Sequence, residues 1–171
     1  MIETARLRIV PLTYEHLVKY VNNDPSLEHD LNLLPTNRTI SPALAEALAQ
    51  SILPRVANTK NNFRYVTLWS VSLKNEKIAV GDLCFKGEPD EKGEIEIGYG
   101  TYDEHRRKGY MTEAVGGMLN WARNQKGIKS IMAETEITNT GSIKILRANG
   151  FVIYKEKDPA VWLRVALRKR S

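Results

Sequence analysis

The stretch that decides the fold runs from Glu94 to Ala114 and reads EIEIGYGTYDEHRRKGYMTEA. Apolar and polar residues alternate at its start, which is typical of a half-buried strand over residues 94–101. The hydrophobic period then lengthens, and a helix is predicted over residues 109–125, with Gly127 placed to end it. The apolar stripe of this helix consists of Ala114, Val115, Met118, Leu119, Trp121 and Ala122. The order is therefore strand, basic turn, helix.

The basic turn has the character of an anion-binding site. Where a strand feeds a helix through a tight turn, several unpaired N–H groups point at one spot and the helix dipole adds positive potential. Arg106, Arg107 and Lys108 would strengthen such a site, and Gly109 would let a ligand or the chain approach closely. We interpret the turn as a candidate pyrophosphate site, although a basic turn taken alone is more typical of a solvated loop.

The remaining elements surround this unit. Strands are predicted at residues 5–10, 64–73, 78–85, 128–137, 151–155 and 161–167. Helices are predicted at residues 14–23, after an N-cap at Ser41, and at residues 139–149. The fold class is α/β, with a mixed sheet and helices on both faces, in a single domain that covers residues 1–171.

Composition narrows the class of protein. The chain has 171 residues, of which 42% are hydrophobic and 26% charged, as in an ordinary globular domain. It shows no apolar run long enough for a membrane span and no secretory signal. One cysteine, Cys84, fits a reducing compartment, and with three histidines it argues against a metal site. We expect a cytoplasmic protein without a metal.

The charge pattern indicates anionic partners. The formal net charge is +5, part of it in the turn and part in the C-terminal Arg168-Lys169-Arg170. A basic balance suits nucleic acid, but it equally suits the phosphates of a small ligand. We interpret the C-terminal residues as a solvated basic tail and do not expect direct nucleic-acid binding.

Two motifs carry a resemblance to a known family. Arg106-x-x-Gly109-x-Met111 resembles the Gln/Arg-x-x-Gly-x-Gly/Ala pyrophosphate motif of the GNAT N-acetyltransferases. The longer string from Arg107 to Ala114 resembles the branch related to the RimJ/RimL ribosomal-protein acetyltransferases. Met111 departs from the motif, but only its amide need face phosphate.

The second motif lies downstream at the family's spacing. It consists of Asn139-x-x-Ser142 followed by Leu146-x-x-x-Gly150-Phe151, and the opening Thr4-x-Arg6-Leu7 also resembles the start of this branch. The resemblance extends over nearly the whole chain, with residues 24–62 least family-like. It implies a GNAT-like, mostly antiparallel sheet with helices on both faces.

The resemblance also implies where acetyl-CoA binds. A V-shaped gap between residues 94–101 and 131–137 would receive pantetheine, and the amides of the turn would hold the pyrophosphate. The expected contacts to acetyl-CoA are Tyr99, Thr101, Arg106, Arg107, Lys108, Gly109, Tyr110, Met111, Thr112 and Asn139.

Acetyl transfer to an amine needs a base, because an amine with a pKa near roughly 10 is mostly protonated at pH 7. Glu96, on the strand beside the gap, is the candidate base, and Glu94 on the same face is the reserve. Neighbouring carboxylates raise each other's pKa, which would suit a base. Both residues could instead be ordinary solvent-facing strand positions.

Two further groups would complete the chemistry. A backbone N–H near Gly98 or Tyr99 would stabilise the oxyanion. Leu146 stands where many relatives have the Tyr that protonates the thiolate, so Ser142 is the candidate for this role. Ser142 could also be a simple polar residue of the first helical turn.

The predicted function is transfer of an acetyl group from acetyl-CoA to a primary amine by direct attack. The acceptor could be a protein N-terminus or a small-molecule amine, and the protein could be a monomer or a homodimer. The missing Tyr at position 146 leaves one alternative, a non-catalytic acyl-CoA-binding regulatory module.

Overall fold

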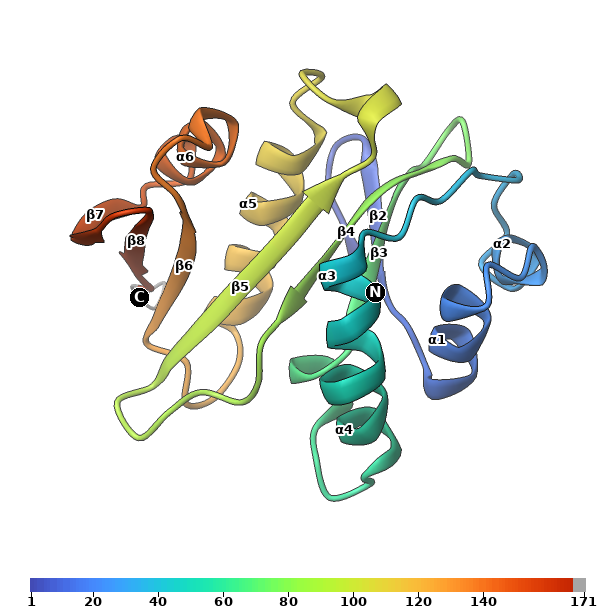
Figure 1. Ribbon diagram of the computed structural model, residues 1–171, viewed down its shortest axis with the longest axis horizontal. Helices are drawn as coiled ribbons and strands as arrows, with labels where there is room; N and C mark the ends of the chain where they lie inside the picture. The colour runs from blue at the N-terminus through green and yellow to red at the C-terminus, as the bar shows by residue number, and fades with distance from the viewer. Residues whose placement is uncertain (168–171) are drawn as a thin grey trace.

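A computed structural model describes residues 1–167, and its centre is one eight-stranded sheet (Figure 1). The strand order across the sheet is β1-β2-β3-β4-β5-β6-β8-β7. All neighbouring strands are antiparallel except β5 and β6, which are parallel. The strands are β1 Ile2–Glu3, β2 Leu7–Pro11, β3 Leu68–Leu73, β4 Ala79–Phe85, β5 Glu94–Thr101, β6 Ser130–Glu136, β7 Val152–Lys157 and β8 Ala160–Ala166. The predicted mixed, mostly antiparallel sheet is confirmed.

Helices cover both faces of the sheet, as predicted. In Figure 1, α5 lies behind the sheet and α3 lies in front of it. Each face has its own apolar cluster: α5 packs into the larger one, and Leu12, Leu17, Leu48 and Leu68 belong to the smaller one on the side of α1. The helices are α1 Tyr14–Val21, α2 Ser26–Asp30, α3 Pro42–Ala47, α4 Leu53–Ala57, α5 Tyr110–Arg123 and α6 Thr140–Ala148.

Strand β5 changes its partner partway along, and this opens the sheet. It pairs with β6 only from Glu94 to Glu96, where Glu96 lies opposite Met132. From Ile97 to Thr101 it pairs with β4 alone. Between residues 97–101 of β5 and the second half of β6 the sheet is therefore parted. This is the V-shaped gap that the sequence predicted.

The segment between α1 and β3 differs most from the sequence-based expectation. Residues 64–67, predicted as strand, lie outside β3: residues 64 and 65 belong to a short 3₁₀ turn, η2 Phe63–Tyr65, which the side chain of Asn62 caps by accepting from Arg64 N. The β-rich composition of this stretch is overridden by that local cap. The helix after Ser41 also runs further than expected, because a wide turn, η1 Leu48–Ile52, connects α3 to α4 and accommodates Pro54 near the start of α4.

Two further predictions concern membrane-spanning helices and the basic C-terminal residues. None of the helices in residues 1–167 is long and apolar enough to cross a membrane. The basic Arg168-Lys169-Arg170, interpreted above as a solvated tail, lies outside the described residues.

Candidate functional site

The turn between β5 and α5 bends through two residues with left-handed backbone. A 3₁₀ turn, η3 Asp103–His105, precedes it, and then Arg107 (φ 62°) and Gly109 (φ 76°) reverse the chain into α5. Glycine adopts this conformation without steric cost, whereas arginine does so only under local constraint. Gly109 is the N-cap of α5, and no side chain caps the helix there. The first amides of α5 are thus left for another partner, as an anion site requires.

A cavity of about 810 Å³ lies against this turn. It falls within the range of about 300–1,000 Å³ that small-molecule sites occupy. Its walls come from the end of β5, the turn, the start of α5 and the start of α6. The lining residues are Tyr99, Gly100, Thr101, His105, Arg106, Arg107, Gly109, Tyr110, Met111, Thr112, Asn139, Thr140, Gly141, Ser142, Lys144 and Ile145.

The main chain of β5 beside the gap alternates between two directions. The carbonyl of Glu96 accepts from Lys86 N, and Tyr102 N donates to Val80 O, so the even-numbered residues bond towards β4. In an antiparallel ladder the intervening residues face the other way. The N–H and C=O groups of Tyr99 and Thr101 therefore face the gap, where an extended ligand could pair with them; the carbonyl of Thr101 already accepts from Arg106 Nε at 3.4 Å.

A phenol and a hydroxyl meet across the gap. The Oη of Tyr99 on β5 lies 2.8 Å from Ser142 Oγ on α6, and it also donates to Ser142 O at 3.2 Å. Asn139 fixes this end of α6, because its Oδ1 accepts from Ser142 N at 3.0 Å. Burial raises the pKa of Tyr99 to about 12, partly offset by the bond to Ser142. The phenol therefore keeps its proton at neutral pH and can donate it.

Glu96 lies where the gap begins, at the last pair that β5 forms with β6. Its carboxylate pairs with Lys86 Nζ, and its side chain is 27% exposed. Glu94, the reserve candidate, accepts from Arg164 and from Ser130 Oγ at 3.0 Å. Each carboxylate thus has its own cationic partner, Lys86 for Glu96 and Arg164 for Glu94.

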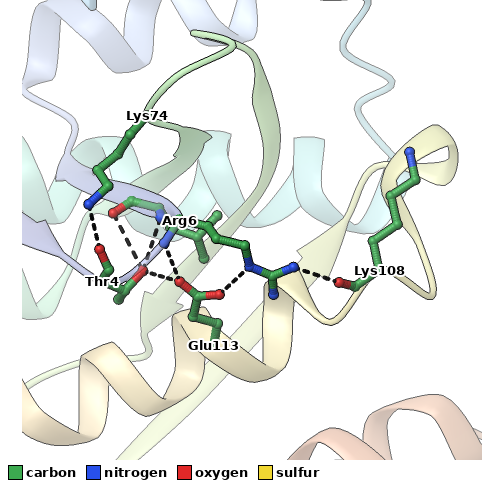
Figure 2. A network of polar contacts seen from close by, with 6 residues as sticks. Thr4, Arg6, Lys74, Lys108 and Glu113 are labelled. Carbon is green, nitrogen blue, oxygen red and sulfur yellow. Dashed lines mark hydrogen bonds and ion pairs between the residues drawn. The ribbon is translucent and has the colours of Figure 1, made fainter.

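The N-terminal segment braces the phosphate turn, as Figure 2 shows. Arg6 donates through Nε to Glu113 on α5 at 2.6 Å and through Nη1 to the carbonyl of Lys108 at 3.2 Å. Its guanidinium also lies 4.8 Å from the centre of the Tyr110 ring. Thr4 Oγ1 donates to the same carboxylate at 2.5 Å. We refer to Thr4, Arg6, Lys108 and Glu113 as the brace.

Glu113 is held in its charged form by the brace. Its partial burial by itself raises the pKa of the carboxyl, but hydrogen bonds from Thr4 and from the backbone and side chain of Arg6 outweigh burial, so that the pKa lies below its usual value. A charged Glu113 in the first turn of α5 is also favoured by the helix dipole.

Most of the predicted site residues come together in the cavity, but two do not. Glu96 and Lys108 are absent from its lining; Glu96 lies at the narrow end of the gap, and Lys108 offers its carbonyl to the brace. The sequence reasoning missed Lys144, an exposed cation on α6 that faces the cavity. His105, which the sequence suggests as a surface or phosphate-shell residue and not as a base, also lines the cavity, and its buried Nδ1 has no partner within residues 1–167.

Metal ligation has no obvious place in this site. Within the described part of the chain, no group of three or more His, Cys, Asp or Glu side chains is arranged to hold a metal ion. What the geometry offers is a gap for an extended chain, unpaired amides and basic side chains for phosphate, and a protonated phenol beside a hydroxyl.

Comparison with known proteins agrees with this geometry. Among curated proteins, the chain is 40% identical over 98 residues to the uncharacterized N-acetyltransferase YjdG of Bacillus subtilis (strain 168), covering 57% of this chain and 58% of the relative. It is 31% identical over 83 residues to the uncharacterized N-acetyltransferase p20 of Bacillus licheniformis, covering 48% and 47%. The chain spans about half the length of the curated relatives it matches.

Solved structures share the fold over nearly the whole chain. The ribosomal-protein-S5-alanine acetyltransferase of Vibrio fischeri matches with a TM-score of 0.64 and 20% identity, covering 96% of this chain and 95% of that one. RimL, a ribosomal L7/L12 alpha-N-protein acetyltransferase solved in complex with coenzyme A, matches with a TM-score of 0.65 and 12% identity, covering 96% of each. At these identities the neighbours show that the fold is shared. The family model described as the acetyltransferase (GNAT) domain matches residues 6–152, and the chain belongs to the GNAT family of acetyltransferases.

Proposed function

We propose that this protein is an N-acetyltransferase that moves an acetyl group from acetyl-CoA to a primary amine by direct attack. The observation that carries the proposal is the parting of β5 from β6, which leads directly to an uncapped, basic helix N-terminus. One continuous cavity thus offers main chain for an extended ligand and amides for a pyrophosphate. Family membership supports the same donor.

Different residues around the cavity would bind different parts of acetyl-CoA. The main chain of Tyr99 and Thr101 would pair with the pantetheine amides as a neighbouring strand does. The amides from Arg107 to Thr112 would bind the pyrophosphate, with Arg106 and Arg107 adding charge. Asn139 would contact the donor from the start of α6 while it caps that helix. Lys144 is a further cation for the phosphates.

Acetyl-CoA, when bound, supplies an activated acetyl group on a thioester. We propose that Glu96 removes the proton from the attacking amine, directly or through water, since it lies where the gap begins. Lys86 would have to yield its ion pair with Glu96 for this step. The N–H of Tyr99 faces the gap and is placed to stabilise the developing oxyanion.

The Tyr99–Ser142 pair offers a candidate for the acid that protonates the thiolate, a role that Leu146 cannot fill. Leu146 is fully buried in the core, so its position offers no donor to the gap. A phenol nevertheless reaches the gap, from β5 instead of from α6. We propose that Tyr99 gives the departing thiolate its proton, with Ser142 holding the phenol in place. The reason to suspect a non-catalytic module is thereby weakened.

The acceptor is a primary amine whose identity the relatives suggest only broadly. Solved structures with the same fold include enzymes named for protein N-termini, which makes a peptide N-terminus one candidate, and a small-molecule amine is the other. Such a protein would work in the cytoplasm, where acetyl-CoA is available.

Donor binding is tested by thermal unfolding with acetyl-CoA. A ligand at about 100 times its Kd stabilises by about 2.7 kcal/mol, which corresponds to about 5–10 °C for a chain of this size. No upward shift at acetyl-CoA concentrations of about 1 mM would end the proposal.

Transfer is tested by measuring CoA release with a panel of amines and free-N-terminus peptides. Glu96→Gln should lower kcat by about 10²-fold or more while acetyl-CoA still stabilises the protein. Glu94→Gln is the matched control, since it removes a carboxylate two residues away. Equal losses in the two variants would remove Glu96 from the role of base.

A further inference from the structure

A buried carboxylate, Asp82 of β4, lies beside the proposed reaction site and has no role in the mechanism above. It is 6% exposed, and it stands directly opposite Gly100 of β5 in the antiparallel register. Residues opposite one another project to the same face of a sheet. That face is the one covered by α1, because the side chain of Tyr20 on α1 reaches Asp82.

Two glycines of β5, Gly98 and Gly100, lie on this face beside the gap. The side chains of Lys86 and Cys84 border Gly98, at 3.5 Å and 3.7 Å from the position that a Cβ would take there, so the open space lies over Gly100. A Cβ built on Gly100 would meet nothing within 4 Å. Gly100 also lines the cavity at the turn, so this residue borders both the space on the Asp82 face and the proposed donor site.

Only one of the two carboxylate oxygens of Asp82 accepts hydrogen bonds from the described residues. Oδ2 accepts from Tyr20 Oη at 2.6 Å and from Tyr102 Oη at 2.9 Å. Oδ1 is buried and has no hydrogen-bond partner among residues 1–167. Native structures rarely leave a buried carboxylate oxygen without a donor, and a functional partner is one of the usual reasons.

No basic side chain of the described chain completes this site. The nearest cation that acts on Asp82 is Arg38, which pairs with the buried Glu28 and lies over the ring of Tyr20, 5.2 Å from its centre. The other titratable groups around the carboxylate are the two phenols and the neighbouring Cys84, whose thiol is kept neutral because burial raises its pKa to about 11. The local charge is therefore negative, with space beside it.

We propose that Asp82, held by Tyr20 and Tyr102, is the subsite that binds the ammonium form of the acceptor in the open space over Gly100. This inference rests on the proposed amine acetylation and names how its acceptor is recognised. An alkylammonium and a peptide N-terminus share the required chemistry, a cation with N–H donors, and both would place their nitrogen between Asp82 and the gap.

The titration of Asp82 agrees with such a role. Burial raises its pKa to about 6, against the lowering effect of the two phenols and of Arg38. The carboxyl is thus charged at pH 7.5 and can attract an ammonium, and it becomes neutral below about pH 6. We expect kcat/KM for the acceptor to show an acid limb near pH 6 in addition to the limb from the amine itself.

The first test is binding of butylammonium, measured by calorimetry at constant ionic strength and compared with butanol. The wild-type protein should prefer the ammonium, and Asp82→Asn should weaken its binding by at least about 30-fold, as expected for truncating a buried charge partner. Asp30→Asn, which removes a partly exposed carboxylate that pairs with Lys19, is the matched control and should bind like the wild type.

The second test is kinetic and uses the amine and the free-N-terminus peptide with the highest CoA release. Asp82→Asn should raise KM for both and lose the acid limb near pH 6. Gly100→Ala, which the space around Gly100 permits, should also raise KM, because the added methyl group takes up part of the space proposed for the acceptor. The acceptor class whose KM rises more in Asp82→Asn, amine or peptide, is the one that the subsite recognises.

The outcomes separate the inference from the proposed function. If CoA is released and Asp82→Asn keeps the wild-type KM and pH profile, Asp82 is structural and the inference is overturned while the function stands. If no amine yields CoA but Asp82→Asn abolishes butylammonium binding, the subsite stands and the proposed function falls. If the wild type binds butanol as well as butylammonium, the inference is wrong whatever the activity.

Discussion

Replacing Arg6 with Met should loosen the phosphate turn, and the brace gives the size of the effect. Arg6→Met removes an ion pair to Glu113, a hydrogen bond to the Lys108 carbonyl and a cation–π contact with Tyr110. Hydrogen bonds to charged groups contribute about 1.5–3 kcal/mol, but the Arg6 side chain is 49% exposed, so solvent screening reduces that figure. We expect a loss of about 1–2 kcal/mol in unfolding free energy, or about 2–8 °C in Tm.

Donor affinity should fall along with stability. The side chain of Arg6 holds the turn whose amides would bind the pyrophosphate through the Lys108 carbonyl, and the loss of that bond leaves the turn less ordered before binding. A hydrogen bond worth about 0.5–1.5 kcal/mol corresponds to a rise in the Kd for acetyl-CoA of about 2- to 10-fold. Thermal unfolding with and without acetyl-CoA, followed by calorimetry, measures both quantities on one sample.

Arg8→Met is the matched control. Arg8 lies two residues further along, in β2, and its ion pair with Glu3 is longer, 3.5 Å, and exposed on both sides. Such a pair contributes about 0–1 kcal/mol, and Arg8 does not touch the turn, so this variant should keep the wild-type Kd. A drop in stability for Arg6→Met without any change in Kd would show that the brace supports only the fold. Equal effects in both variants would refute the reasoning altogether.

Three further predictions test the site. Gly109→Ala should cost about 1–2 kcal/mol in unfolding free energy, because alanine is strained at φ 76°; an unchanged Tm would contradict the assigned backbone. Tyr99→Phe should lower kcat by about 10²-fold or more with little change in the Kd for acetyl-CoA; full activity there, with loss in Ser142→Ala, would move the acid to Ser142. The folded pKa of Asp82 is raised to about 6, so its ionisation costs stability as pH rises from about 4 to 6. The Tm of Asp82→Asn minus that of the wild type should therefore increase between pH 4.5 and pH 7.5, and a constant difference would mean that Asp82 does not titrate in this range.

The parts of the fold that the sequence predicts well are those with a strong local signal. The switch from a period of two to a helical period between Thr101 and Gly109 places β5, the turn and α5 correctly. The gap itself has no local signal, since partner choice along β5 depends on β4 and β6, which are distant in sequence. Its prediction came from the family motifs and not from the periodicity.

The least predictable features depend on contacts between distant segments. The brace joins Thr4 and Arg6 to Glu113 across more than 100 residues, and no property of either segment alone indicates this pairing. The same holds for Tyr99 and Ser142, which become partners only because α6 lies alongside the parted end of β5. Residues 63–67 failed for the opposite reason: their composition favours a strand, but the Asn62 cap and the packing of Tyr65 against the core select a turn.

The placement of Asp82 argues that the two faces of the sheet have separate tasks. On the side of α5, β5 turns Tyr99 and Thr101 towards the donor cavity, and large apolar side chains fill the remaining space. On the side of α1, the same strand presents Gly98 and Gly100, beside a carboxylate that is costly to bury without a cation. A protein that needed only to bind the donor would gain stability from an apolar residue at position 82. A carboxylate with one unpaired oxygen lowers the stability of the fold, and such a local loss is typical of a functional site. Under the proposal above, the acceptor is therefore recognised on the face of the sheet opposite to α5.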